Sequence, residues 1–191
     1  SDEKIINCLK SISFNIPVIV VENSNNKNFK NKIENIFTNV NCILAGENKG
    51  YATANNIGLK SVKTKYALVL NPDTILDKDA IKFFFNTKEQ VKDFWLIGPA
   101  NNQIINFNEN DSNFKEVNNL KGFAIFLNLS KFNQDYFDEN FFLFFEEIDL
   151  CRRVKKNKGK IYLHKNIFIK HDGASSVNKT NKLDLEKTRN W

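Results

Sequence analysis

Several features that mark whole classes of protein are missing from this sequence of 191 residues. Its three cysteines, Cys8, Cys42 and Cys151, lie far apart, which excludes a disulfide framework and a cysteine metal cage. No apolar run approaches the roughly 18 to 20 residues of a membrane span, and no signal peptide is visible. These absences predict a protein of the reducing cytoplasm, with the inner face of the membrane as a second place of action.

Signatures of nucleic-acid binding are also absent. The net charge of +6 fits nucleic acid, anionic lipid or an anionic small molecule equally well. No zinc-finger spacing, helix-turn-helix signature or aromatic-plus-basic RNA motif accompanies that charge. We therefore expect no nucleic-acid partner, whereas peripheral contact with a membrane stays open.

The apolar content of 41% and the chain length predict one globular α/β domain with a sizeable core. Because strands that alternate with helices form parallel sheets, we expect a mostly parallel central sheet with helices on its faces. In such sheets, ligands bind at the carboxyl ends of the strands. Strands are predicted at 17–21, 42–44, 66–70, 94–97, 122–127, 161–163 and 167–169, helices at 3–12, 28–37, 51–62, 77–86 (N-cap Asp77) and 146–157, and loops at 101–119 and 172–182.

Two polar clusters follow the first two predicted strands. The first runs from Glu22 to Asn26, and its side chains either satisfy their own backbone or face a ligand. The second, Asn48 to Tyr51, opens the helix at 51–62. Its Gly50 permits a positive φ or a close backbone approach, and the first helical amides could meet a phosphate. A plain helix entry explains the second cluster equally well.

The segment Asn71-Pro72-Asp73 ends the buried strand at 66–70. Pro72 has no N–H to donate, so it ends the strand ladder, and it biases Asn71 towards an extended conformation. Asp73 is thereby presented at the strand tip. A carboxylate there can hold a divalent cation that in turn holds a diphosphate, or it can simply start a turn.

A further group of acids opens the helix at 146–157, whose C-terminal part is basic. That arrangement complements the helix dipole, at about 0.3–1 kcal/mol for each charge. The acids also follow the apolar segment 141–145, which would raise their pKa and suit one of them to general-base catalysis. Of the two histidines, His164 is interpreted as a partly buried strand residue, and His171 ends a strand beside a glycine-containing loop.

In their order along the chain, these clusters resemble family 2 of the GT-A glycosyltransferases, especially the rhamnosyltransferase-like branch. The family pattern reads DNxS, NxGxAxAxNxG, NPD, FDExFFxxxEDxDLxxR and a strand-end H. Its counterparts are ENSN at 22–25, NKGYATANNIG at 48–58, NPD at 71–73, FDENFFLFFEEIDLCRR at 137–153 and HDGASS at 171–176. The resemblance implies a GT-A domain over residues 1–176, followed by the start of a tail or helix at 177–191. The family's first strand has no counterpart, so we expect a sheet that lacks it and an N-terminally trimmed chain.

The resemblance also implies a role for each matched position. Glu147 takes the place of the catalytic base, with Glu146 and Asp149 as rival candidates. Asp73 and His171 match the residues that hold Mg²⁺ or Mn²⁺ and the diphosphate. The positions implied in binding the nucleotide sugar are Glu22, Ser24, Asn48, Gly50, Asn55, Asp73 and Arg153. Positions 22 and 147 are Glu where the family usually has Asp.

The implied activity is inverting transfer of a sugar from a dTDP- or UDP-linked donor to a hydroxyl of a glycan or lipid-linked acceptor. The main alternative is a degenerate transferase domain that binds a nucleotide sugar without catalysis. A nucleotidyltransferase and a basic surface module acting through residues 152–160 are further alternatives.

Overall fold

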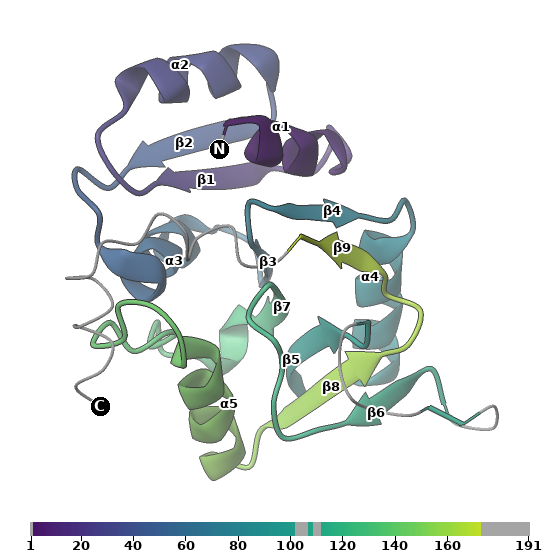
Figure 1. The fold of residues 1–191 in the computed structure, drawn as a ribbon. Helices are drawn as coiled ribbons and strands as arrows, with labels where there is room; N and C mark the ends of the chain where they lie inside the picture. Colours follow the sequence, from purple (N-terminus) through teal and green to yellow (C-terminus); the bar gives the residue numbers. More distant parts are fainter. Residues whose placement is uncertain (1, 102–106, 109–111, 173–191) are drawn as a thin grey trace.

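The chain folds into a central sheet with helices on both faces, as described by a computed structural model for residues 2–101, 107–108 and 112–172 (Figure 1). The predicted tail at 177–191 and the predicted loop beyond Asp172 lie outside these residues. The elements are α1 (Asp2–Lys10), β1 (Val18–Glu22), α2 (Lys27–Ile36), β2 (Val40–Leu44), α3 (Gly50–Ser61), β3 (Tyr66–Leu70), β4 (Thr74–Leu76), α4 (Ala80–Gln90), β5 (Phe94–Pro99), β6 (Phe114–Glu116), β7 (Ala124–Asn128), a 3₁₀ turn (Leu129–Lys131), α5 (Glu146–Lys156), β8 (Lys160–His164) and β9 (Ile169–His171).

The strands pair as a mixed sheet, which corrects the prediction of a mostly parallel one. The five-stranded sheet has the order β3-β7-β5-β8-β6. Only β5 and β8 are parallel within it, whereas β7 runs antiparallel to both β3 and β5. A parallel neighbour needs a long crossover that is usually helical, and the described residues hold no helix between β5 and β7. The chain therefore returns antiparallel.

The remaining described strands form two small sheets. Strands β1 and β2 pair in parallel, and β4 pairs antiparallel with β9. Neither pair is bonded to the five-stranded sheet. Helix α3 packs against β1, because Gly58 leaves no side chain and Val21 Cγ2 lies 3.2 Å from where a Cβ would stand. The helix thus joins the first sheet to the domain core.

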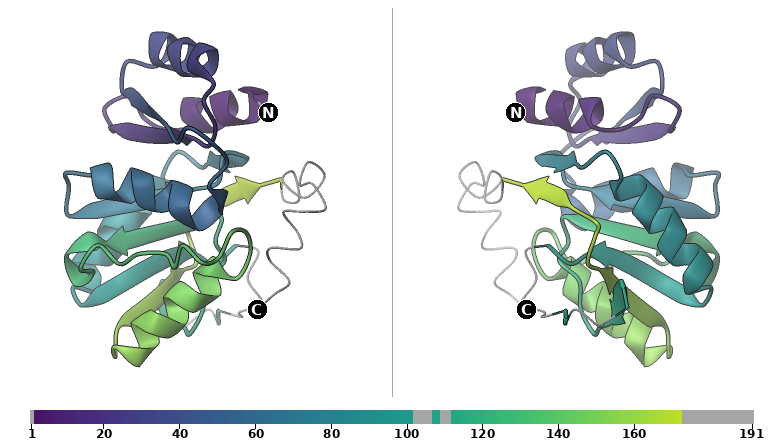
Figure 2. Two further views of the ribbon diagram at one scale, coloured as in Figure 1. Left: turned by 90° about the vertical axis from the view of Figure 1, so that its left-hand side faces the viewer. Right: turned by 90° about the vertical axis from the view of Figure 1, so that its right-hand side faces the viewer.

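Both faces of the five-stranded sheet are covered. All five residues of β7 are buried, and the four apolar ones, Ala124–Leu127, point alternately to two core clusters. Leu127 belongs to the cluster formed with α3 and α5, whereas Phe126 belongs to the cluster formed with α4. The side views show α3 and α5 on one side of the molecule and α4 on the other (Figure 2). The expected central sheet flanked by helices is therefore confirmed.

Local differences from the predicted elements have simple causes. Helix α4 begins at Ala80 with Asp79 as its N-cap, so the predicted N-cap at Asp77 is wrong. The Asp77 carboxylate instead accepts from the Asp79 amide at 3.2 Å, in the turn before the helix. Strand β4 was not predicted because only the apolar pair Ile75-Leu76 follows the turn at Asp73. Strand β6 corrects part of the loop predicted at 101–119, whose polar residues give no alternating pattern. Within the described residues, no helix is long and apolar enough to cross a membrane.

Candidate active site

Helix α3 begins where the chain comes closest to the segment that leads into α5. Gly50 has φ +80°, and a Cβ there would lie 2.5 Å from the carbonyl oxygen of Phe142. The Tyr51 amide donates to that same oxygen at 2.7 Å. Only glycine permits this contact, so the predicted positive φ and close backbone approach of Gly50 are confirmed.

The polar cluster after β1 is bonded to the start of α3. The Glu22 carboxylate accepts from Ser24 Oγ at 2.6 Å and from the Asn26 amide at 2.9 Å. Asn23 donates to Asn48 Oδ1 at 3.0 Å and accepts from the Lys49 amide at 2.9 Å. The first two predicted clusters therefore form one connected patch.

The amides at the start of α3 already have protein partners. The Lys49 amide donates to Asn23 and the Gly50 amide donates to Asn48 Oδ1 at 3.2 Å. The Tyr51 amide is occupied by Phe142. A phosphate could reach these three donors only by displacing those acceptors, so the amides are not a ready-made phosphate site.

The strand-tip residues after β3 meet the end of β9. His171 Nε2 lies 3.3 Å from Asp73 Oδ1 and 3.4 Å from the Asn71 side-chain nitrogen. The imidazole stacks on Phe123 with 4.8 Å between ring centroids and an interplanar angle of 10°. Asp73 is 9% exposed, so this pair is held largely out of water.

Tyr51 contacts Asn71 at the strand tip and is influenced by the charges of the α5 acids. Its hydroxyl lies 3.0 Å from Asn71 Oδ1 and 2.9 Å from the carbonyl oxygen of Gly122. Burial raises the pKa of Tyr51, and the charges of Glu146, Glu147 and Asp73 raise it further. The tyrosine hydroxyl is therefore neutral, and it is influenced by three acidic groups that come from two separate parts of the chain.

The first two acids of α5 are buried to different degrees. Glu146 is 5% exposed, and its Oε2 has no hydrogen-bond partner among the described residues. Burial raises its pKa to about 7, and the Glu147 charge contributes. Glu147 is half-buried beside Gly122, where an added Cβ would lie 3.5 Å from the Glu147 carboxyl carbon, and burial raises the pKa of Glu147 as well. The predicted rise in pKa at these acids is confirmed in direction.

The other predicted residues on α3 and α5 have partners of their own. Asp149 accepts from Arg153 Nε at 2.7 Å. Arg153 also donates to the backbone carbonyls of Asp135, at 3.3 Å, and of Tyr136, so it fastens the 135–136 segment to α5. Asn55 donates to the carbonyl of Tyr51 at 2.9 Å, within its own helix. The binding roles of Asn55 and Arg153 stay predictions.

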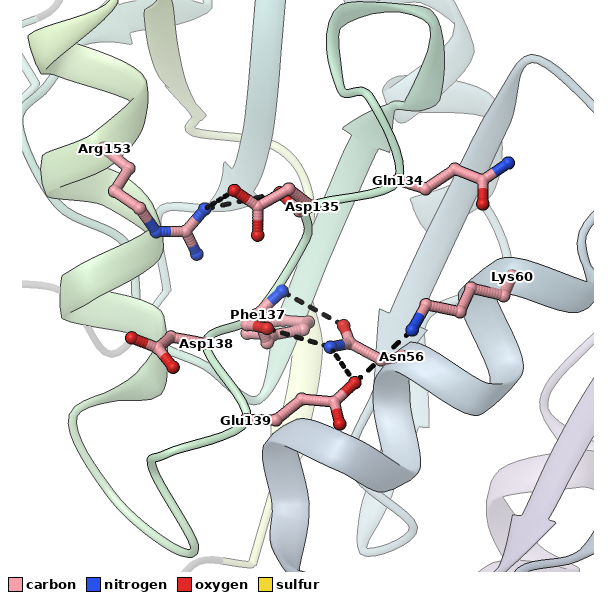
Figure 3. A pocket seen from close by; sticks show the side chains of 8 residues that line it. All are labelled: Asn56, Lys60, Gln134, Asp135, Phe137, Asp138, Glu139 and Arg153. Atoms are coloured by element: carbon pink, nitrogen blue, oxygen red, sulfur yellow. Dashed lines mark hydrogen bonds and ion pairs between the residues drawn. The ribbon is translucent and has the colours of Figure 1, made fainter.

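The cavity shown in Figure 3 lies beside α3 and α5 and has a volume of about 420 Å³. Its polar groups largely satisfy one another. Asn56 donates to the Phe137 carbonyl at 2.8 Å and accepts from the Phe137 amide at 3.0 Å, and Glu139 accepts from Asn56 at 2.9 Å. We do not interpret this cavity as the active site, because Asp73, Glu147 and His171 do not line it. It surrounds the hydrogen bonds by which Asn56 holds the 135–139 segment.

The Asp73–His171 pair fits part of a divalent-cation site. A carboxylate oxygen and an imidazole nitrogen converge within 3.3 Å, which is a suitable donor set for Mn²⁺ or Mg²⁺. Across the described residues, no three acidic, histidine or cysteine side chains are grouped as a metal site. The protein would therefore supply two ligands and leave the others to phosphate oxygens and water, as is common for Mg²⁺.

Sequence reasoning missed two residues that hold the site together. Asn23 bonds the end of β1 to the start of α3, and Tyr51 bonds α3 to the strand tip at Asn71. Both stand inside the polar clusters quoted from the sequence. Their position next to the motif residues was the available signal, but which side chain bridges to which strand depends on tertiary packing.

Comparison with known proteins places this geometry in a family. Residues 3–152 match the family described as Glycosyl transferase family 2. A relative in Haloferax volcanii, named low-salt glycan biosynthesis hexosyltransferase Agl10, is 27% identical over 183 residues, which cover 82% of this chain and 59% of the relative. This chain thus spans about three fifths of that relative's length.

Solved structures agree with the fold. The crystal structure of S. aureus TarS 1-349 has a TM-score of 0.65 at 16% identity and covers 86% of this chain and 55% of that chain. Its complex with UDP-GlcNAc has a TM-score of 0.68 at 16% identity, and the shares covered are 94% and 59%. The expected GT-A fold is confirmed by this similarity. Because the family match covers well over half of the residues, the chain belongs to glycosyl transferase family 2.

Proposed function

We propose that this chain transfers a hexosyl or rhamnosyl group from a nucleoside-diphosphate donor to a hydroxyl of a glycan or lipid-linked acceptor. One observation carries the proposal: contacts lead from Asp73 and His171 through Asn71 to the Tyr51 hydroxyl. The charges of the α5 acids Glu146 and Glu147 raise the pKa of that same hydroxyl. A site for the diphosphate and a site for a base thereby share one neighbourhood. The family and the name of the hexosyltransferase relative support the same reaction class.

Glu147 is the proposed general base. Asp149 is held by Arg153, and Glu146 is almost fully buried, whereas Glu147 is half-buried and can be reached by an acceptor. Burial raises the Glu147 pKa, which makes its carboxylate a stronger base than an exposed glutamate. Glu147 would take the proton from the acceptor hydroxyl as that oxygen attacks the anomeric carbon, and the nucleoside diphosphate would leave from the opposite face. Such base catalysis typically contributes about 10²–10⁴-fold.

Asp73 and His171 would hold Mg²⁺ or Mn²⁺ together with the donor's diphosphate. When bound, the cation would offset the negative charge that develops on the leaving diphosphate. The stacking of His171 on Phe123 and the contact of its Nε2 with the Asn71 side chain both restrain the imidazole. Such restraint before the donor arrives would reduce the ordering cost of binding.

The nucleoside end of the donor is assigned to the patch formed by Glu22, Ser24 and Asn48. The TarS structures named in complex with UDP and with UDP-GlcNAc support a uridine nucleotide, and a dTDP-linked donor differs chiefly in its base and 2′-position. Glu22 is one methylene longer than the aspartate usual there, so it would reach the ribose hydroxyls rather than the base edge. The Glu22–Ser24 bond keeps that carboxylate oriented.

The test combines binding with turnover. Thermal shift with UDP and dTDP, each with and without Mn²⁺, should show a rise in Tm for the preferred nucleotide, because a ligand stabilises the state it binds. Sugar transfer should then be lost in Glu147→Gln and retained in the control Glu89→Gln on α4. Nucleotide binding with no transfer by the parent protein would favour the alternative, a non-catalytic nucleotide-sugar-binding domain. No nucleotide binding at all would reject both.

A further inference from the structure

The helix that carries the two buried acids also exposes an apolar end. Phe144 and Phe145, which precede α5, are 41% and 58% exposed, and Ile148 in its first turn is 44% exposed. The opposite side of the helix buries Leu150 and Val154 in the core. Phe145 and Ile148 stand three positions apart, so they share one face of the helix. Large apolar side chains gathered in this way mark an interaction surface more often than scattered ones do.

The backbone holds the two phenylalanines outward at a conformational cost. Phe144 and Phe145 have φ of +71° and +70°, in the left-handed region that bulky residues disfavour. The turn itself has a structural purpose, because Phe142 is fixed against Gly50 and the chain must reverse before Glu146. Glycine or asparagine would make that turn more easily. The fold therefore explains the turn but not the choice of two exposed aromatic residues for it.

The same face of α5 continues into uncompensated positive charge. Arg152 and Lys156 are exposed, and neither has an ion pair or hydrogen bond with any described residue. By contrast, Asp149 is neutralised by Arg153 at 2.7 Å, and Lys155 is neutralised by Glu116 at 2.8 Å. The outward face therefore consists of an apolar tip followed by two free cations.

We propose that this face of α5 docks on an anionic membrane, with Phe144, Phe145 and Ile148 entering the headgroup boundary and Arg152 and Lys156 against anionic headgroups. An aromatic tip next to basic residues is the chemistry of interfacial helices. A bilayer fits better than a second copy of the chain, because a protein of net charge +6 repels itself and is attracted to anionic lipid.

The consequence of membrane docking for catalysis rests on the proposed function. Glu146 and Glu147 begin the same helix whose tip would enter the membrane. Docking would therefore bring the acids to the bilayer surface, where a lipid-linked acceptor presents its hydroxyl. Docking would therefore favour acceptors that lie in the membrane, in addition to any contact that the protein makes with the acceptor sugar.

The experiment is co-sedimentation of the whole chain with vesicles of phosphatidylcholine, with and without phosphatidylglycerol. Phe144→Ser combined with Phe145→Ser should lower the partition coefficient about tenfold or more. Arg152→Gln combined with Lys156→Gln should lower it roughly fivefold per cation on the anionic vesicles only. Two matched controls should stay within about twofold of the parent: Phe14→Ser with Phe168→Ser, and Lys78→Gln with Lys82→Gln.

A second measurement separates insertion from adsorption by charge. Phe145→Trp keeps an aromatic tip, and its additional fluorescence should shift to the blue when anionic vesicles are added. The proposal is overturned if the chain does not bind vesicles, or if the control aromatic pair loses as much binding as the tip pair. It is also overturned if sedimentation velocity shows a dimer of the parent chain that is lost on combining Phe144→Ser with Phe145→Ser (the tip variant). The same holds if Arg152→Gln with Lys156→Gln weakens binding to RNA and leaves binding to vesicles unchanged.

The result can be told apart from a failure of the proposed function. A UDP-induced rise in Tm that persists in the tip variant shows that the variant is folded and that its donor site is intact. If the parent chain shows no nucleotide binding, the proposed function fails, while the vesicle assay still decides the membrane surface.

Discussion

His171 Nε2 lies 3.3 Å from Asp73 Oδ1 because β4 and β9 pair antiparallel with Thr74 opposite His171. The pairing places the end of β9 beside the turn that follows Pro72. A strand of only three residues thus brings together two side chains from distant parts of the chain. The register of this small sheet determines whether a cation could be held at all.

Replacing either member of this pair should abolish the effect of the metal without unfolding the protein. Asp73→Asn and His171→Ala each remove one of the two proposed ligands, so the extra rise in Tm that Mn²⁺ gives with a bound nucleotide should disappear. Transfer activity should fall on the order of 10²-fold or more, as when one stabiliser of developing charge is lost. Asp77→Asn, on the exposed turn before α4, is the control and should keep both effects. Retention of the Mn²⁺ effect in both site variants would contradict the metal assignment.

Substituting the two neighbouring glutamates, Glu146 and Glu147, should show which of them is the catalytic base. Glu147→Gln should lower the rate constant for transfer about 10²–10⁴-fold with little change in donor affinity, because it removes the base and keeps the shape. If Glu146→Gln instead gives the larger loss of rate, the base has been assigned to the wrong residue. Pre-steady-state transfer at saturating donor is the measurement that distinguishes them.

Glu146 should also make stability depend on pH in an unusual direction. Its folded pKa of about 7 lies above the ordinary value of 4.5, so the folded state binds more protons than the unfolded state between these two values. Stability should therefore fall as pH rises from about 4.5 to about 7, by at most about 3 kcal/mol. Glu146→Gln should remove this fall and be more stable than the parent at pH 8. Glu139→Gln should instead lower the stability at neutral pH, because the hydrogen bond from Asn56 holds the pKa of Glu139 below its usual range and so favours the folded state with an ionised carboxylate.

The part of the site that the sequence predicts is the part set by local pattern. The clusters at 22–26, 48–51 and 71–73 each follow an apolar run predicted as a strand, and the carboxyl ends of strands are where α/β folds bind ligands. The residues alone place His171 at a strand end, whereas its role beside Asp73 comes only through the family resemblance, because the pairing of β9 with β4 depends on long-range contacts. The antiparallel insertion of β7 between β3 and β5 depends on long-range pairing, which residue periodicity does not encode.

Two glycines offer a matched test of the contact between α3 and the segment leading into α5. Gly50→Ala combines a positive φ with a Cβ 2.5 Å from the Phe142 carbonyl oxygen, whereas Gly46→Ala has φ +87° but open space around its Cβ. Gly46→Ala should cost only the left-handed strain, about 1–2 kcal/mol. Gly50→Ala should cost about 2 kcal/mol more than that and displace Tyr51, so the tyrosine's bridge to Asn71 should weaken. Urea unfolding measures both costs, and equal values would show that the close approach is unimportant.

Substituting the adjacent asparagines Asn55 and Asn56 on α3 should distinguish an effect on folding stability from an effect on nucleotide binding. The Asn56 side chain is 3% exposed and pairs with both the N–H and the C=O of Phe137, so Asn56→Ala leaves two buried backbone groups without partners. We expect a loss of about 2–4 kcal/mol in the free energy of unfolding. Asn55→Ala removes one bond to its own helix and should cost less than about 1 kcal/mol, while weakening nucleotide binding if the predicted role is right. Urea unfolding and UDP titration of the two variants give the comparison. If Asn55→Ala binds UDP as the parent does, then Asn55 is only a helix residue, and the donor patch is confined to Glu22, Ser24 and Asn48.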